Sequence, residues 1–372
     1  MNEYERRALV VGGTGPTGPF VVNGLLERGF HVTILHTGRH ENDEIPPQVD
    51  HIHTDPFDAD ATLAALGNST FNLGVLMYGR LRTLSPALVG RIDRLITIGG
   101  VGAIRGWVEP GDLFPTGMTV PTPDDAPLAS ADEPIGKIRR IVATEQVVFE
   151  HHPTAIHLRY PMLYGPRQLI PREWPMVRRA LDRRPVFIVA DGGLTLKSAA
   201  FVENAAHAVL CAVDNHSAGA GQIFNVTDDR TLTIRQMAEV VADELDHRFE
   251  FVSLPAELAL PSRPLVMHHS TGHRVVNTES LRSVLGYRDL VTPEEGLRRT
   301  VRWLVANPLS SKAETVLQDP FDYAAEDQLI ARWRAMMDQF EVPNFVEEPG
   351  YGVAYYGRAT NPATGTSRVE PL

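Results

Sequence analysis

Residues 8–18 read ALVVGGTGPTG, and three of the glycines in this stretch, Gly12, Gly15 and Gly18, follow one another with two residues between them. The apolar run before the glycines is typical of a buried parallel strand, and the amphipathic pattern from Pro19 onward indicates a helix. Glycines at this junction let the backbone turn tightly and let a pyrophosphate approach the free N–H groups of the helix N-terminus. The stretch therefore predicts a dinucleotide-binding site rather than merely a tight strand–helix turn.

The end of the second predicted strand bears on the choice of nucleotide. That strand covers residues 30–35, and in a doubly wound sheet its C-terminal end faces the adenosine ribose. Sites that prefer NAD usually place Asp or Glu about 20 residues beyond the glycine turn. Here His36 stands 18 residues after Gly18 and is followed by Thr37 and Arg39. The missing carboxylate and the nearby guanidinium favour the 2′-phosphate of NADP; NAD stays the alternative, since Arg39 could be a solvated loop charge.

Other short apolar runs predict the remaining strands of a doubly wound parallel sheet. They lie at residues 49–52, 71–77, 95–98, 155–159 and 222–226. Because the C-terminal ends of parallel strands form the ligand-binding edge of such a sheet, the residues that follow them are candidate contacts. Asp55, just past the third strand, could contact the adenine ring or begin a helix, although Asp58 is the better helix cap.

Composition limits the classes of protein that fit. The chain of 372 residues has 43% hydrophobic and 22% charged residues, which is ordinary for a globular protein and long enough for two lobes. A net charge of −11, with no run of Lys and Arg, opposes binding to nucleic acid or anionic membranes. The single cysteine, Cys211, cannot form an internal disulfide. With neither a signal peptide nor a membrane span in the sequence, we expect a cytoplasmic protein.

Two segments have distinct compositions. Residues 106–130 are rich in Pro, Gly and Asp, which predicts a long loop over the site. Residues 171–184 combine an amphipathic helical pattern with several arginines. For these arginines, a solvated helix face is the simplest interpretation.

These motifs together resemble the extended short-chain dehydrogenase/reductases, also called the NAD-dependent epimerase/dehydratase family. The glycine turn, Asp55 and the stretch 159–167, RYPMLYGPR, carry the resemblance, which covers about residues 7–305. It implies a Rossmann domain, a smaller substrate domain and a possible homodimer. The implied boundaries are residues 1–165 and 196–228 for the NAD(P)-binding domain, 166–195 and 229–345 for the substrate domain, and 346–372 for a C-terminal tail.

In that family the segment matching Pro161–Leu163 lines the nicotinamide, and the end of the fourth strand runs beside the nicotinamide ribose. The predicted cofactor contacts are therefore Gly12, Thr14, Gly15, Pro16, Thr17, Gly18, His36, Thr37, Arg39, Asp55, Pro56, Met77, Gly79, Gly99, Pro161, Met162 and Leu163.

The chain departs from the family at the acid/base residues. Family members carry Tyr-x-x-x-Lys on the helix after the long loop and a Ser or Thr at the end of the fifth strand. If Glu145 matches the glutamate that usually follows that motif, Lys137 and Ile141 stand at the Tyr and Lys positions. Gly99 and Gly100 stand where the hydroxyl belongs. The usual pair is thus absent from the sequence.

Four residues remain candidates for chemistry or substrate binding. Lys137 is the first, because a closed apolar cleft can lower the pKa of a lysine toward neutrality; its KIRR string also resembles the lysine-bearing helix of reductases of the isoflavone reductase and phenylcoumaran type. A surface lysine is the alternative. Tyr78, at a strand end, is the second, or else a wall of the pocket. Tyr164 and Arg167 are predicted substrate contacts, with a structural ion pair as the alternative for Arg167.

Metal chemistry is not expected. Two histidines are adjacent at residues 151–152 and again at 268–269, and neighbours on a regular helix or strand cannot direct both imidazoles to one ion. No HExxH or CxxC spacing occurs in the sequence. The sequence predicts an NAD(P)-dependent oxidoreductase acting on a small organic carbonyl or alcohol. Two alternatives stay open: an epimerase, dehydratase or lyase with retained NAD, and a catalytically silent nucleotide-sensing protein.

Overall fold

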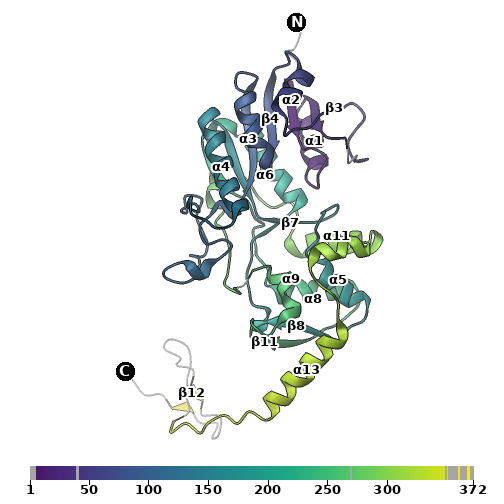
Figure 1. Ribbon diagram of the computed structural model, residues 1–372, viewed down its shortest axis with the longest axis vertical. Coiled ribbons are helices and arrows are strands. Elements are labelled where there is room, and N and C mark those ends of the chain that lie inside the picture. Colours follow the sequence, from purple (N-terminus) through teal and green to yellow (C-terminus); the bar gives the residue numbers. More distant parts are fainter. Residues whose placement is uncertain are drawn as a thin grey trace. The chain divides into compact units, whose positions relative to one another are not determined.

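A computed structural model describes residues 6–38, 42–268, 270–347, 350, 359–360 and 367–368 (Figure 1). Its residues group into two compact units, 1–326 and 327–372. Among the described helices, none is long and apolar enough to cross a membrane.

A seven-stranded parallel sheet forms the centre of the larger unit. Its strands are β1 (Arg6–Val11), β2 (Phe30–His36), β3 (Asp50–His53), β4 (Phe71–Met77), β5 (Ile92–Gly100), β6 (Ile156–Tyr160) and β10 (Ile223–Asn225). Their order is β10-β6-β5-β4-β1-β2-β3, and all neighbours run parallel. The chain therefore winds outward in both directions from the junction of β1 and β4, which confirms the predicted Rossmann-type sheet.

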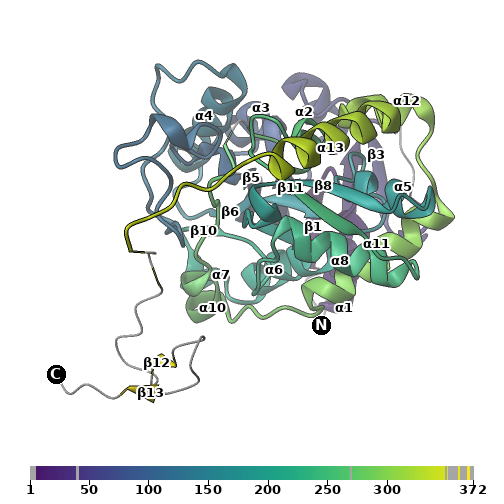
Figure 2. The same ribbon diagram turned by 90° about the horizontal axis from the view of Figure 1, so that it is seen from below.

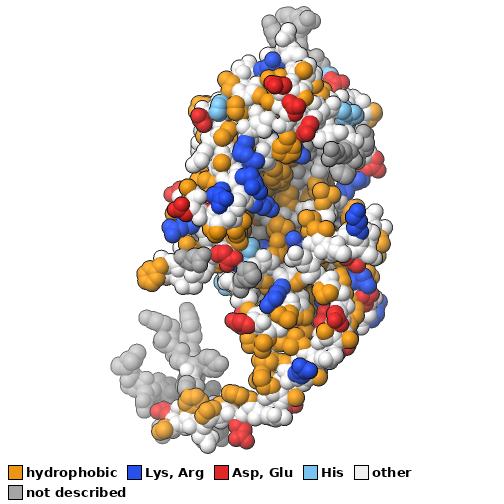
Figure 3. Space-filling view, in the orientation of Figure 1, with side chains coloured by type: hydrophobic (Ala, Val, Ile, Leu, Met, Phe, Trp, Pro, Cys, Tyr) orange, Lys and Arg blue, Asp and Glu red, His pale blue; other side chains and the backbone are white. Residues whose placement is uncertain are grey.

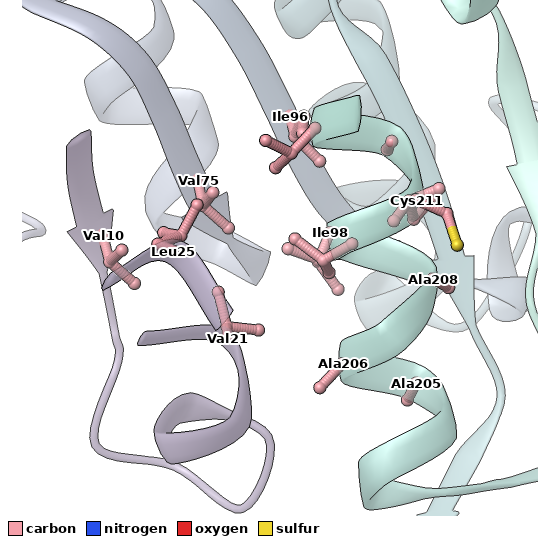
Figure 4. Close-up of a cluster of buried hydrophobic side chains, with 14 of the residues drawn as sticks. Val10, Val21, Leu25, Val75, Ile96, Ile98, Ala205, Ala206, Ala208 and Cys211 are labelled. Carbon is pink, nitrogen blue, oxygen red and sulfur yellow. The ribbon is translucent and has the colours of Figure 1, made fainter. Parts of the chain in front are cut away.

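Helices cover both faces of this sheet (Figure 2). One layer contains α1 (Gly18–Glu27) and α6 (Val202–Asp214), and the other contains α2 (Ala59–Leu66), α3 (Leu81–Ala87) and α4 (Gly136–His151). Figure 4 shows α1 and α6 packing aliphatic side chains against the strands, with Cys211 in the same core. The helices also touch each other, since a methyl group on Gly24 of α1 would lie 2.3 Å from Leu210 Cδ1 of α6.

A second hydrophobic core lies in the part of this unit that follows the sheet. There β7 (Met162–Tyr164) pairs with β9 (Ala199–Phe201), and β8 (Val186–Ala190) pairs with β11 (Glu250–Leu254). The core is built from α5 (Trp174–Leu181), α8 (Ile234–Glu244) and α11 (Pro293–Ala306) packed around β8 and β11. The remaining short helices are α7 (His216–Gly219), α9 (Arg263–Val266), α10 (Glu279–Leu285) and α12 (Ser311–Glu314).

The arginines of the predicted basic helix are not all solvated. Arg179 of α5 is only 2% exposed. Its guanidinium binds Asp319 through a 2.6 Å contact and also pairs with Glu326. Burial is tolerated because two carboxylates compensate the charge, so the expectation of a solvated face is wrong at this position.

The smaller unit contains the greater part of α13 (Tyr323–Asp338), together with a two-stranded antiparallel pair, β12 (Ala359–Thr360) and β13 (Ser367–Arg368). Much of the predicted tail, residues 346–372, lies outside the described residues. The predicted domain boundaries within the larger unit stay a prediction.

Candidate dinucleotide and substrate site

The glycine turn lies between the end of β1 and the start of α1. Gly12 has a φ of 92°, which favours glycine. A Cβ atom on Gly18 would lie 1.9 Å from the carbonyl oxygen of Gly13, so no side chain fits there. The Thr17 side chain makes no capping hydrogen bond, and α1 begins at the next residue. The amide of Gly18 already donates to the carbonyl oxygen of Gly15 at 2.9 Å, and Pro19 has no N–H. Of the first three helix positions, Phe20 therefore has the amide that could meet the anion of the predicted nucleotide site.

The predicted adenosine contacts lie at the ends of β2 and β3. His36 is 5% exposed, whereas Thr37 and Asp55 are exposed. Asp55 Oδ1 accepts a hydrogen bond from the amide of Phe57 at 3.0 Å. Asp58 caps α2 through the amide of Ala61, which confirms its predicted role. Arg39 lies outside the described residues.

Tyr78 has a left-handed backbone at the end of β4, where the 3-10 turn η1 (Tyr78–Arg80) begins. Its φ is 61°, a conformation that costs energy for a residue with a side chain. Tyr78 is 45% exposed as a residue, yet desolvation raises the pKa of its phenol to about 12, against the opposing charge of Arg80. The hydroxyl thus keeps its proton at neutral pH and can donate a hydrogen bond.

Arg80 lies across the glycine turn, a contact that the sequence analysis missed. A Cβ atom on Gly12 would be 2.8 Å from Arg80 Nη1. The guanidinium carbon is 5.8 Å from the centre of the Phe57 ring. Arg80 Nε is buried and has no hydrogen-bond partner among the residues that the structure describes. Asp55 is the carboxylate whose charge acts on Arg80, and a guanidinium with an unpartnered buried nitrogen beside a nucleotide turn is itself a candidate phosphate contact.

Figure 3 shows a hollow with hydrophobic side chains in its floor and Lys and Arg side chains gathered along its rim over α3 and α4. Of the predicted contacts near this edge of the sheet, Met77 and Pro161 are buried, whereas Gly79, Met162 and Leu163 are partly exposed.

The end of β5 and the helix α4 lie together, as the family resemblance implies. Ile141 Cδ1 would be 3.3 Å from a Cβ atom on Gly102, just beyond β5. Lys137 stands one turn earlier on the same helix and hence on the same side. Its side chain is exposed, so the closed apolar cleft expected around it is not present. Gly99 faces the α4 layer too, because a Cβ atom there would be 2.4 Å from His157 Nε2, which lies 3.6 Å from Glu145 Oε1 of α4.

Another lysine has the lowered pKa that was expected for Lys137. Burial and the nearby charges of Arg274 and Arg172 lower the pKa of Lys197 to about 7, which Glu173 only partly offsets. Its ammonium donates to the carbonyl oxygen of Val266 at 3.3 Å. Lys197 lies two residues before β9.

Arg159, the first residue of the RYPMLYGPR stretch, and Glu145 of α4 form a buried ion pair. Arg159 makes two 2.8 Å hydrogen bonds to the Glu145 carboxylate, and His157 Nε2 lies 3.6 Å from Glu145 Oε1. Desolvation alone would raise the pKa of Glu145, but the hydrogen bonds and charges of Arg159 and His157 outweigh it and lower that pKa to about 2. The pair joins α4 to β6 and so fixes the helix that carries Lys137.

The two predicted substrate contacts have structural partners instead. Tyr164 is 3% exposed, and its hydroxyl donates to Asp228 Oδ2 at 2.6 Å. Arg167 Nη2 lies 2.6 Å from Asp43 Oδ1 and 3.2 Å from Glu44 Oε1. These positions argue against both substrate contacts and favour the ion-pair alternative for Arg167.

A histidine cluster occurs where no metal site was predicted. His36, His51 and His53 each have a potential ligand atom within 4.8 Å of the others. The His36 and His51 rings are joined by a 2.9 Å contact between Nε2 and Nδ1. The sequence analysis considered only histidines adjacent in the chain, and these three come together through the pairing of β2 with β3.

The known proteins that are similar in sequence or in structure include reductases, epimerases and dehydratases. No family model matches the chain. It is 24% identical over 306 residues to the 3-diazoavenalumate denitrifying reductase of a Streptomyces species, covering 76% of this chain and 95% of the relative. It is 22% identical over 329 residues to a putative UDP-glucose 4-epimerase of Methanocaldococcus jannaschii, covering 80% and 98%.

Solved structures show the same fold. The UDP-glucose 4-epimerase of Thermotoga maritima with UDP-glucose gives a TM-score of 0.64 at 18% identity, covering 81% of this chain and 99% of that one. The dTDP-glucose 4,6-dehydratase of Bacillus anthracis in complex with NAD gives 0.60 at 16% identity, covering 81% and 97%. The chain is similar to members of the NAD-dependent epimerase/dehydratase family, the extended short-chain dehydrogenase/reductases, and the relatives named here are enzymes.

Proposed function

We propose that the chain is an NAD(P)-dependent oxidoreductase that acts on a small organic carbonyl or alcohol without the usual Tyr-x-x-x-Lys pair. Nucleotide binding is supported by one observation. The glycine turn follows β1, where the strand order reverses between β1 and β4, and the Arg80 guanidinium lies beside Gly12. An anion at the N-terminus of α1 would meet both the positive end of the helix dipole and this cation.

The residues would divide the work between binding and proton transfer. When bound, the nicotinamide supplies or accepts the hydride. The Tyr78 phenol, which stays protonated at neutral pH, donates a hydrogen bond to the substrate oxygen. Reduction of a carbonyl also needs a proton at that oxygen, and an exposed group can take its replacement from water.

Tyr78 is favoured over Lys137 as the group that contacts the substrate oxygen. Tyr78 follows β4 directly and lies two residues before Arg80, beside the glycine turn. Lys137 is exposed on the first turn of α4 and would have to approach across the end of β5. We keep Lys137 as the second proton donor of the proposal.

NADP stays the preferred nucleotide in this proposal and NAD the alternative. His36 occupies the position where NAD-preferring sites usually have a carboxylate, and no acidic side chain follows β2 directly. Neither a homodimer nor a cytoplasmic location is needed for the proposed chemistry; both stay predictions.

Two other functions have support and are separated by one experiment. The names of several relatives favour an epimerase or dehydratase with retained NAD. The exposed Lys137 suits a nucleotide-sensing protein without catalysis. Freshly purified protein is denatured, and the released nucleotide is identified by mass and absorbance.

The outcomes differ for each function. Protein without nucleotide that binds NADPH and oxidises it with a small aldehyde or ketone supports the reductase. One NAD⁺ per chain favours the epimerase or dehydratase. Binding without turnover of any carbonyl favours the sensor, and a protein that binds neither NADPH nor NADH contradicts all three.

A further inference from the structure

Three histidines bring their rings together at the outer edge of the sheet. His36 is the last residue of β2, and His51 and His53 are the second and fourth residues of β3. The parallel register places His36 opposite His53. Residues two apart on a strand project to the same face, so His51 and His53 lie on the face that His36 shares.

The distances between the rings are close to those of metal ligands. His36 Nε2 and His51 Nδ1 are 2.9 Å apart, and one nitrogen of each ring lies within 4.8 Å of the others. Two nitrogens on a tetrahedral zinc ion are separated by roughly 3.3 Å, given Zn–N bonds of about 2.0–2.1 Å. The observed spacing includes this value, and His51 and His53 are exposed and can turn to reach it.

A backbone hydrogen bond restricts the orientation of the His36 ring. Its Nδ1 accepts a 3.3 Å hydrogen bond from the amide of Gly38, so in the neutral ring Nε2 carries the proton that faces His51. An ion bound at Nε2 displaces this proton to Nδ1. The contact that gives way is then the long one to Gly38, which costs little compared with a bond to the ion.

The surroundings allow an open coordination position. His51 also lines a shallow depression together with Asn42 and Asp43. Asp43 is held by Arg167, and Asp50, beside His51 in the chain, is held by His31 at 2.8 Å. The three imidazoles therefore form the donor set, with water or a small ligand completing it. Three histidines with an open position suit zinc and its neighbours cobalt, nickel and copper rather than magnesium or calcium.

We propose that His36, His51 and His53 form a binding site for one divalent transition-metal ion of the zinc type. The site joins β2 to the short edge strand β3. Binding of the ion requires neither the nucleotide nor a substrate, although His36 also lies at the end of β2 that is predicted to face the adenosine ribose.

The test uses the full chain without a polyhistidine tag, stripped of metal with a chelator. Co²⁺ is added, and the visible d–d absorption is followed together with calorimetric titration of Zn²⁺. We expect one ion per chain with a Kd of about 1 μM or tighter, corresponding to about 8 kcal/mol. The exposed variants His51→Ala and His53→Ala should each weaken binding at least about 10-fold, or about 1.4 kcal/mol.

A matched control is His151→Ala, because His151 lies on α4, away from β2 and β3, and its Nδ1 contacts the carbonyl oxygen of Val147 in its own helix. This variant should bind the ion as the unaltered chain does. Zn²⁺ should also raise the melting temperature of the unaltered chain and of His151→Ala, but not that of His51→Ala. Several weak ions per chain, retained in His51→Ala, would mark ordinary surface histidines and overturn the proposal. So would no binding up to about 100 μM Zn²⁺.

Discussion

Arg159 and Glu145 face each other through two hydrogen bonds of 2.8 Å, with both side chains almost fully buried. They come from β6 and α4, so the pair fastens the helix that carries Lys137 to the sheet. Arg159 belongs to the stretch that carries the family resemblance, and its role in this structure is to hold α4 in place through Glu145.

Removal of one partner should therefore destabilise the fold strongly. Glu145→Gln leaves the Arg159 guanidinium buried without its counter-charge, and we expect a loss of about 3–5 kcal/mol in the free energy of unfolding. Urea unfolding measures this loss. The control Glu239→Gln breaks a solvent-exposed pair with Arg235 and should cost less than about 1 kcal/mol.

The same pair predicts a dependence on pH. The pKa of Glu145 falls from an ordinary 4.5 to about 2 on folding, so the unfolded chain takes up the proton first. The stabilisation is complete above pH 4.5 and is lost as the pH falls through 2. The difference between the unaltered chain and Glu145→Gln should shrink over that window, and a constant difference would contradict the assignment.

Arg80→Met should weaken nucleotide binding. Loss of a charge-assisted contact to a phosphate is expected to raise the Kd about 10-fold, or about 1.4 kcal/mol. Fluorescence titration with NADPH and with NADH measures it. Equal losses place Arg80 on the diphosphate, and a loss confined to NADPH places it on the 2′-phosphate. The control is Arg235→Met on α8; unchanged affinity in Arg80→Met would remove Arg80 from the site.

Tyr78→Phe should lower turnover about 100-fold, within the range for a positioned proton donor, while nucleotide affinity is retained. Lys137→Met is the matched comparison, since its residue is exposed and lies on a different element. Steady-state oxidation of NADPH with a carbonyl substrate gives both rates. If only Lys137→Met slows the reaction, Lys137 and not Tyr78 is the group that contacts the substrate oxygen.

Lys197→Met should stabilise the chain at neutral pH, because it removes a buried charge whose neighbours include Arg172 and Arg274. In the unaltered chain the pKa of Lys197 is about 7, against an ordinary 10.5. Between these values the unfolded chain binds one more proton, so stability rises with pH by up to about 1.4 kcal/mol per unit. The advantage of Lys197→Met should accordingly shrink from pH 7 to pH 10 in urea unfolding; an advantage that grows would contradict it.

Local sequence signals predicted the sheet well. The glycine spacing and the apolar runs identify β1 and its neighbours because each pattern lies within one strand or one turn. Asp58 could be assigned as a helix cap for the same reason.

Contacts between distant segments could not be predicted in this way. The position of Arg80 over Gly12 depends on how β4 lies beside β1, and the histidine cluster depends on the register of β2 with β3. The environments of Lys137 and Lys197 depend on packing, which periodicity does not reveal. A signal for Arg80 did exist, in a basic residue three positions after a strand that ends at the ligand edge.

The two carboxylates that neutralise Arg179 limit how far the chain can be shortened. Asp319 and Glu326 pair with the buried guanidinium. They follow Arg179 in the sequence by 140 and 147 residues. Synthesis of the chain must therefore proceed past Glu326 before this charge can be buried without penalty, and a truncation before Asp319 should give insoluble protein even though the nucleotide turn is complete.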